Sequence, residues 1–138
     1  MSDFVVYHNP DSMGYPAEQV DTLSIVTDKS ANTALGSRIW LITGEGTPRT
    51  FYLCGWFTAT SVGPDPNGDF NTVVEGTVGV MLRKKRWPIL NHLPWFPPFK
   101  ENQGNFAFGF QPINQRAVVQ GLEALIAKLT PPSPSADV

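Results

Sequence analysis

A proline-rich aromatic segment constrains the fold more than any other part of the chain. Residues 93–105 read Leu-Pro-Trp-Phe-Pro-Pro-Phe-Lys-Glu-Asn-Gln-Gly-Asn. The prolines at 94, 97 and 98 have no backbone N–H and a fixed φ, so we expect neither an ordinary helix nor a central strand here. Trp95, Phe96 and Phe99 nonetheless need shelter from water. The segment is therefore expected to be a stiff aromatic loop, either the wall of a binding site or a plug of the core.

The size and composition of the chain indicate one globular domain. Its 138 residues are enough for a single sizeable core but not for two. Hydrophobic residues make up 41% and charged residues 16%, which is typical of a folded domain. We expect this domain to span residues 1–130, and the Pro/Ser-rich residues 131–138 to form a disordered tail or linker.

The cysteine content and the lack of targeting signals indicate a cytoplasmic protein. Cys54 is the only cysteine, so there is no disulfide framework. The first residues lack the basic stretch and apolar core of a secretory signal. No apolar run approaches the roughly 20 residues that span a bilayer, so no membrane partner is expected.

The formal net charge of −2 hides an uneven distribution of charge along the chain. Acidic residues outnumber basic ones through Leu82, and the only basic cluster, Arg83-Lys84-Lys85-Arg86, follows at once. Four contiguous cations are suited to bind phosphates, whose sequence-independent attraction dominates nucleic-acid affinity. The alternative is a solvated turn, because a short basic run has little specificity.

Hydrophobic periodicity predicts a largely β chain. Ser37 to Thr43 is apolar enough for a central strand that is buried on both faces, and Gly44 to Pro48 has the composition of a hairpin turn. Gly55 is the expected site of a bulge or bend. The expected strands are Phe4–Tyr7, residues 22–26, 37–43 and 50–62, a pair or one bent strand over 70–82, and a strand carrying Phe106, Phe108 and Phe110.

Helices are expected at three places. Residues 17–20 have the pattern of a short helix, and residues 28–35 that of a capped helical turn that Gly36 ends. From Asn114 to Leu129 the apolar residues recur at helical spacing, which predicts a terminal amphipathic helix that closes the core.

No set of residues predicts catalysis or a metal site. The two histidines, His8 and His92, lack zinc-ligand spacing, and Cys54 lies within a strand, where a buried and inert thiol is the common case. We therefore expect no enzyme activity, no metal and no cofactor. An acid–base pair of His8 with Asp11 or Asp28 is an alternative for which only the residue types argue.

The order of the expected elements resembles the EVE-like branch of the PUA-like superfamily, which includes the YTH readers. The polar corner after the first strand is Tyr7-His8-Asn9, and Phe51 to Phe57 resembles a later barrel strand with its glycine. Leu93 to Ile113 takes the place of a loop that enters a strand near the family's pocket. One departure is that Ser24 to Asp28 stands where EVE proteins carry the signature Trp-x-Gly-Val-Arg-Asn, without its tryptophan or arginine.

The resemblance implies an α+β fold: a PUA-like mixed β-barrel with short helices at its ends and a C-terminal amphipathic helix. It also implies a pocket that holds a flipped, often methylated, nucleobase between aromatic side chains. The base stacks on these rings, and polar groups of the pocket recognise its hydrogen-bonding edge. The candidate stackers are Trp40, Trp56 and Trp95. The candidate polar contacts to the base are Tyr7, His8, Asn9, Ser24, Thr27, Asp28 and Asn105.

Two functions remain open from the sequence. The first is a nucleic-acid-binding module that reads a modified base in DNA or RNA and is joined to, or recruits, an effector protein. The second is a small-molecule or protein-interaction module that uses the same aromatic pocket, which the acidic first two-thirds of the chain favours.

Overall fold

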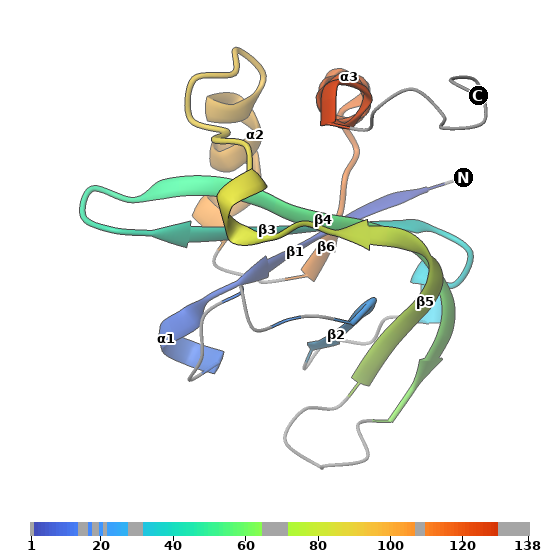
Figure 1. Cartoon of the computed structure of the whole chain (residues 1–138). Coiled ribbons are helices and arrows are strands. Elements are labelled where there is room, and N and C mark those ends of the chain that lie inside the picture. The colour runs from blue at the N-terminus through green and yellow to red at the C-terminus, as the bar shows by residue number, and fades with distance from the viewer. Residues whose placement is uncertain are drawn as a thin grey trace, which may run out of the picture.

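The computed structural model describes residues 2–13, 17, 20, 22–27, 32–64, 72–106 and 110–129. These residues form one six-stranded mixed sheet in the order β2-β5-β4-β3-β1-β6, which curves into a half-barrel (Figure 1). The mixed, barrel-like α+β architecture that we expected is confirmed at this level. The strands are β1 (Asp3–His8), β2 (Ser24–Thr27), β3 (Arg38–Glu45), β4 (Thr50–Gly63), β5 (Thr72–Met81) and β6 (Phe110–Pro112). The helices and 3-10 turns are α1 (Pro10–Met13), η2 (Asn32–Ala34), η3 (Lys84–Arg86), α2 (Phe96–Asn102), η4 (Gly104–Phe106) and α3 (Arg116–Leu129).

Strand β3 lies in the interior of the sheet, as expected. It pairs in parallel with β1 and antiparallel with β4. Six of its residues in succession are buried, because both faces of the strand are covered. Ile39 and Leu41 face one side, whereas Trp40 and Ile42 face the other.

The two faces of the sheet carry separate cores. The inner core lies within the curve of the half-barrel, where β2 lies in Figure 1. The outer core lies between the sheet and helices α2 and α3. The inner core consists of Phe4, Val6, Ala17, Ile25, Ala34, Ile39, Leu41, Cys54, Phe57, Ala59, Val74, Trp87 and Phe110. The outer core consists of Val5, Trp40, Ile42, Phe51, Leu53, Leu90, Phe96, Phe99, Phe106, Ile113, Val118 and Leu122.

A bulge in β4 shifts which of its residues face each core. Leu41 pairs with Gly55 and Ile42 pairs with Leu53, so Cys54 is the extra residue. A bulge changes which residues face each side, because side chains alternate along a strand. The sequence placed the bulge at Gly55, one residue away. Gly55 is needed for close approach instead, since a Cβ there would lie 2.6 Å from the backbone oxygen of Val80.

The aromatic segment contains a helix, so our expectation of a loop was wrong. Helix α2 begins at Phe96 and has Pro97 and Pro98 in its first turn. The first N–H groups of a helix have no intrahelical acceptor, so proline costs little there. Phe96 and Phe99 are buried in the outer core.

The strand that we expected to carry Phe106, Phe108 and Phe110 does not begin at Phe106, so the start of that prediction was wrong. Phe106 lies in the turn η4 with a φ of 64°, not in a strand, and β6 begins at Phe110. Residues 107–109 lie outside the described residues. Phe106 stacks on Tyr7 with ring centroids 5.3 Å apart, so tertiary packing fixes its conformation.

Several other expectations are confirmed in whole or in part. β1, β2, β3, β4 and α3 form where the periodicity predicted them, and residues 72–81 form one strand with two register shifts. The turn before Gly36 is present as η2, with Gly36 at a φ of 81°. The expected helix at 17–20, the start of the turn at 28–31 and the tail at 131–138 fall wholly or largely outside the described residues.

Helix α3 covers the outer core and contacts Trp95 closely. Its Val118 and Leu122 are buried. Gly121 faces the indole of Trp95, and a Cβ at this position would lie 2.5 Å from Trp95 Cδ1. Trp95 also packs edge-on against Phe96, with ring centroids 6.1 Å apart. The tryptophan therefore fills the space between α2 and α3.

The carboxylate of Asp3 joins β1, β3 and α3. Asp3 is 8% exposed, and its Oδ1 accepts hydrogen bonds from Trp40 Nε1 at 2.8 Å and Arg38 Nε at 2.7 Å. Arg38 Nη2 donates to Glu123 Oε2 of α3 at 3.0 Å, and the guanidinium lies 4.7 Å from the centroid of the Trp40 ring. Burial tends to lower the pKa of Arg38, but the hydrogen bonds to Asp3 and Glu123 raise it, and the net pKa lies above the usual value.

Replacing Gly121 with alanine tests the contact between Trp95 and α3. Alanine is normally favoured over glycine in a helix by about 1 kcal/mol. Here we expect Gly121→Ala to lower the free energy of unfolding by about 1–3 kcal/mol, because the new methyl group overlaps the indole. Urea unfolding measures the change, and Gln120→Ala on the exposed face of the same helix is the matched control. A more stable Gly121→Ala variant would contradict the close contact.

Two substitutions of Asp3 separate its roles. Asp3→Ala leaves the buried indole N–H of Trp40 without its acceptor and removes a partner of Arg38, so we expect a loss of about 2–4 kcal/mol of stability. Asp3→Asn keeps an oxygen acceptor and should lose less. Thermal and urea unfolding of both variants would measure this. Equal stability of both variants and the wild type would show that the carboxylate does not stabilise the fold.

Candidate ligand-binding cavity

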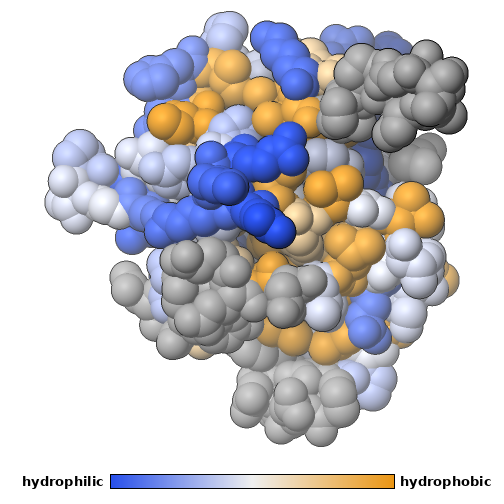
Figure 2. All heavy atoms as spheres, viewed as in Figure 1, coloured by the Kyte–Doolittle hydropathy of each residue, from blue (hydrophilic) through white to orange (hydrophobic). Residues whose placement is uncertain are grey.

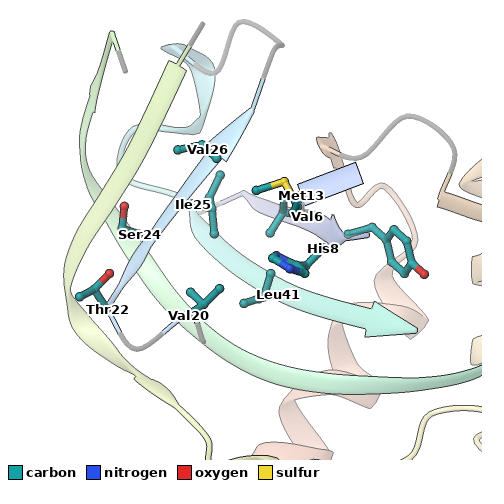
Figure 3. Close-up of a pocket in the computed structure, with 10 residues that line it drawn as sticks. Val6, His8, Met13, Val20, Thr22, Ser24, Ile25, Val26 and Leu41 are labelled. Carbon is teal, nitrogen blue, oxygen red and sulfur yellow. The ribbon is translucent and has the colours of Figure 1, made fainter. Parts of the chain in front are cut away.

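A cavity of about 360 Å³ opens on the inner face of the half-barrel (Figure 3). Its size lies in the range of small-molecule sites. The walls come from the end of β1, from α1 and from the segment that contains β2, and β3 contributes one residue. The lining residues are Val6, Tyr7, His8, Met13, Val20, Thr22, Ser24, Ile25, Val26 and Leu41.

His8 supplies a buried imidazole at this cavity. Its position is fixed by the parallel register, which places it beside Thr43 of β3. Thr43 Oγ1 donates a hydrogen bond of 2.7 Å to the backbone oxygen of His8. The side chain is 6% exposed and lies close to Leu41 and Val6 in Figure 3. A polar ring thus lies among aliphatic side chains.

Strand β2 forms the opposite wall. Its pairing with β5 places Ser24 beside Glu75 and Ile25 beside Val74. Figure 3 shows Ile25 pointing from β2 toward Met13, Val6 and His8. Most of the lining is aliphatic, so the cavity favours an apolar body with few polar contacts.

Three of the ten residues expected to bind ligand line this cavity: Tyr7, His8 and Ser24. Asn9 follows directly, and its backbone oxygen accepts the hydrogen bond of 2.9 Å from Met13 N that closes α1. Thr27 is buried at the far end of β2 and does not line the cavity. Asp28 and the side chain of Asn105 lie outside the described part of the chain.

Tyr7 touches the cavity from a strand position whose ring faces the other side of the sheet. The ring packs on Phe51 and Phe106 of the outer core. Its hydroxyl accepts a hydrogen bond of 2.7 Å from Arg49 Nη1. Along β1, Val6 and His8 therefore face the cavity, whereas Tyr7 faces away.

The three expected tryptophan stackers lie on the outer face, away from the cavity. Trp40 is fully buried in the outer core and has no surface with which to contact a ligand. Trp56 is half-buried and packs against Trp40, with ring centroids 6.2 Å apart. Trp95 fills the space beside Gly121. The sheet lies between these rings and His8, so the structure does not bring the expected residues together as one aromatic pocket.

Sequence reasoning missed the aliphatic lining. Met13, Val20, Ile25 and Leu41 carry no chemical signal that distinguishes a cavity wall from a core. The only usable sign was the polar corner at the end of the first strand, which did identify His8.

The basic run forms the exposed turn η3. Lys84 Nζ lies 3.3 Å from Glu45 Oε1, and Arg86 Nη2 donates to the backbone oxygen of Leu129 at 3.1 Å. Neither Arg83 nor Lys85 has an ion-pair partner among the described residues. Figure 2 shows the hydrophilic surface that this turn forms on the viewed face. Two of the four cations are thus available to a partner.

The chemistry of the remaining candidates is limited. Burial raises the pKa of the Cys54 thiol far above its usual value, and the negative charge of Glu45 adds to this shift. Cys54 therefore stays protonated and unreactive at neutral pH. Within the described residues, no three His, Cys, Asp or Glu side chains are grouped to hold a metal ion. The side chains of Asp11 and Asp28 lie outside that part, so their pairing with His8 stays a prediction.

No helix of the described part of the chain is both long and apolar enough to span a bilayer.

Comparison with known proteins does not assign the chain to a family. No protein-family model matches it, and no curated protein is significantly similar in sequence.

Proposed function

We propose that the protein is a binding module without catalytic activity of its own, whose inner cavity receives a nucleobase flipped out of a nucleic acid. The observation that carries this proposal is the buried imidazole of His8 in the wall of a cavity of about 360 Å³. The module is expected to act through a linked or separate effector protein.

The cavity combines two properties of a ligand site. Its aliphatic walls can bury the apolar surface of a flat ligand away from water. Such walls favour a base whose hydrogen-bonding edge is small or is capped by a methyl group. The imidazole of His8 can donate or accept a directed hydrogen bond, and such a bond is stronger in a dry wall than in water. The aliphatic walls would therefore supply most of the affinity for the base, and the hydrogen bond of His8 would fix its orientation.

The exposed basic turn favours a nucleic acid as the carrier of this base. Arg83 and Lys85 present charge to solvent without ion-pair partners among the described residues. Lysine and arginine contacts to phosphates give a sequence-independent attraction. A free metabolite would not need such a surface.

A free small molecule is the second candidate. It is favoured by the aliphatic lining and by the position of the tryptophans on the opposite face. A base reader commonly stacks its base on an aromatic ring, and no tryptophan lines this cavity. The two candidates differ in whether the basic turn contributes to binding.

His8→Phe tests the cavity. The phenyl ring keeps a flat aromatic ring at this position but cannot hydrogen-bond, so we expect affinity for the preferred methylated oligonucleotide to fall about tenfold or more. His92→Phe is the matched control, because His92 is the other histidine and is exposed. Fluorescence anisotropy with methylated and unmodified DNA and RNA would measure binding, with circular dichroism as a check of folding. Equal affinity of both folded variants and the wild type would place the ligand elsewhere.

Neutralising the basic turn tests the nucleic acid. For Arg83→Ala combined with Lys85→Ala, we expect the slope of log affinity against log salt to become shallower by about one to two, since fewer counterions are released. The control replaces Arg116 and Lys128, two exposed cations of α3, and should keep the wild-type slope. An unchanged slope in the turn variant would contradict phosphate contact. Binding of free nucleosides but of no oligonucleotide would favour the second candidate.

A further inference from the structure

Two basic residues lie close to Phe51 on the outer side of the sheet. Arg49 comes shortly before Phe51, at the turn between β3 and β4. Lys100 belongs to α2, which lies over the sheet on the side of this turn (Figure 1), and its Nζ is 5.1 Å from the centroid of the Phe51 ring. Neither Arg49 nor Lys100 has an ion-pair partner in the part of the chain that the structure describes. This end of the outer face therefore carries two uncompensated positive charges.

A neutral group holds Arg49 in place. Its Nη1 donates a hydrogen bond of 2.7 Å to the hydroxyl of Tyr7. Gly44 leaves room for this contact, because a Cβ there would lie 2.6 Å from the Tyr7 hydroxyl oxygen and 2.7 Å from Arg49 Cγ. The hydroxyl is uncharged, so the guanidinium keeps its full charge and its other N–H groups can bind a ligand. Arg49 is thus positioned without being neutralised.

An aromatic ring holds Lys100 in a similar way. Its ammonium group lies over the Phe51 ring in a cation–π contact, which positions the charge and leaves its N–H groups for a ligand. Lys100 is half-buried and lines an open cavity of about 350 Å³. The other lining residues are Asn91, Phe96, Pro97 and Glu101.

Asn91 fixes the backbone next to both cations. Its Oδ1 accepts a hydrogen bond of 2.7 Å from Phe51 N, and its Nδ2 donates one of 3.2 Å to the backbone oxygen of Arg49. Asn91 also lines the cavity together with Lys100. One side chain therefore joins the segment that carries Arg49 to the cavity wall that carries Lys100. Such support keeps the groups of a binding site in place before the ligand arrives.

Two fixed cations match an anion that carries two negative charges. A phosphate monoester has about two charges at neutral pH and three acceptor oxygens, whereas a carboxylate has only one charge. Guanidinium and ammonium groups both bind phosphate oxygens well. The exposed carboxylate of Glu101 lines the same cavity and repels a further anion, so the cavity suits one phosphate group and not a run of them.

We propose that Arg49 and Lys100 form a binding site for one phosphate monoester on the outer face of the sheet. The phosphate belongs either to the end of a nucleic acid or to a free phosphorylated small molecule, because both present the same group. The inference does not depend on which ligand occupies the inner cavity.

Titration of the full chain with inorganic phosphate tests the proposal by heteronuclear NMR. We expect saturable shift changes at the backbone N–H of Phe51 and the side-chain amide of Asn91, and none with sodium chloride at equal ionic strength. Arg49→Gln and Lys100→Gln should each raise the dissociation constant about fivefold or more, because each removes one of the two charges. Arg116→Gln, at an exposed cation of α3, is the matched control and should leave the constant unchanged. The same spectra show whether each variant is folded.

Two further variants distinguish a positioned site from general attraction of anions. Tyr7→Phe keeps every charge but removes the hydroxyl that holds Arg49, so the dissociation constant should rise about threefold. Glu101→Gln removes the opposing charge and should lower the constant about twofold. The proposal would be overturned by an absence of saturable shifts, by equal losses in Arg49→Gln and Arg116→Gln, or by an unaffected Tyr7→Phe variant. Acetate that binds as tightly as phosphate would also overturn it.

Phosphorylated ligands then identify the source of the phosphate. An oligonucleotide with a terminal phosphate that binds more tightly than its hydroxyl form, with the gain lost in Arg49→Gln, identifies the end of a nucleic acid. A free nucleoside monophosphate that shifts Phe51 and Asn91, while the terminal phosphate gives the oligonucleotide no gain, identifies a small molecule. Failure of both would overturn the proposal. Phe51 and Asn91 do not line the inner cavity, so these shifts are distinct from binding there.

Discussion

The rest of the structure depends on the carboxylate of Asp3, which accepts hydrogen bonds from Trp40 and Arg38 at the start of two neighbouring strands. These bonds hold β1 and β3 in a parallel register that pairs Asp3 with Arg38. The same register, followed to the other end of β1, places His8 beside Thr43. Arg38 also reaches Glu123, which ties the strand pair to the helix that covers the outer core.

The sheet separates two tasks. Its outer face carries Trp40, Trp56 and Trp95 together with Phe51, Phe96, Phe99 and Phe106, and this aromatic packing supports the fold. The cavity at His8 lies on its inner face. The bulge at Cys54 shifts the alternation of β4, so that Cys54 and Phe57 both face the inner core. A site that is backed by a rigid core keeps its shape when a ligand enters.

The strands and α3 could be predicted because their apolar periodicity agrees with their burial, most clearly for β3. The helix at Phe96 could not, because Pro97 and Pro98 prevent a helix interior but suit a first turn, and the sequence does not show where the turn begins. The lining of the candidate cavity was predicted in part: the polar corner after the first strand includes His8, which lies in the cavity wall. The tryptophans were assigned to a pocket because exposed and buried aromatics have the same sequence signature, whereas tertiary packing placed them on the outer face.

We propose that the ligand enters the inner cavity and not the aromatic outer core. Methyl-resolved NMR during titration with the oligonucleotide that binds best tests this most directly. We expect shift changes at the methyl groups of Met13, Ile25 and Leu41, which line the cavity, and little change at Leu90 and Leu122 of the outer core. Changes centred on Leu90 and Leu122, with Met13, Ile25 and Leu41 unaffected, would contradict it.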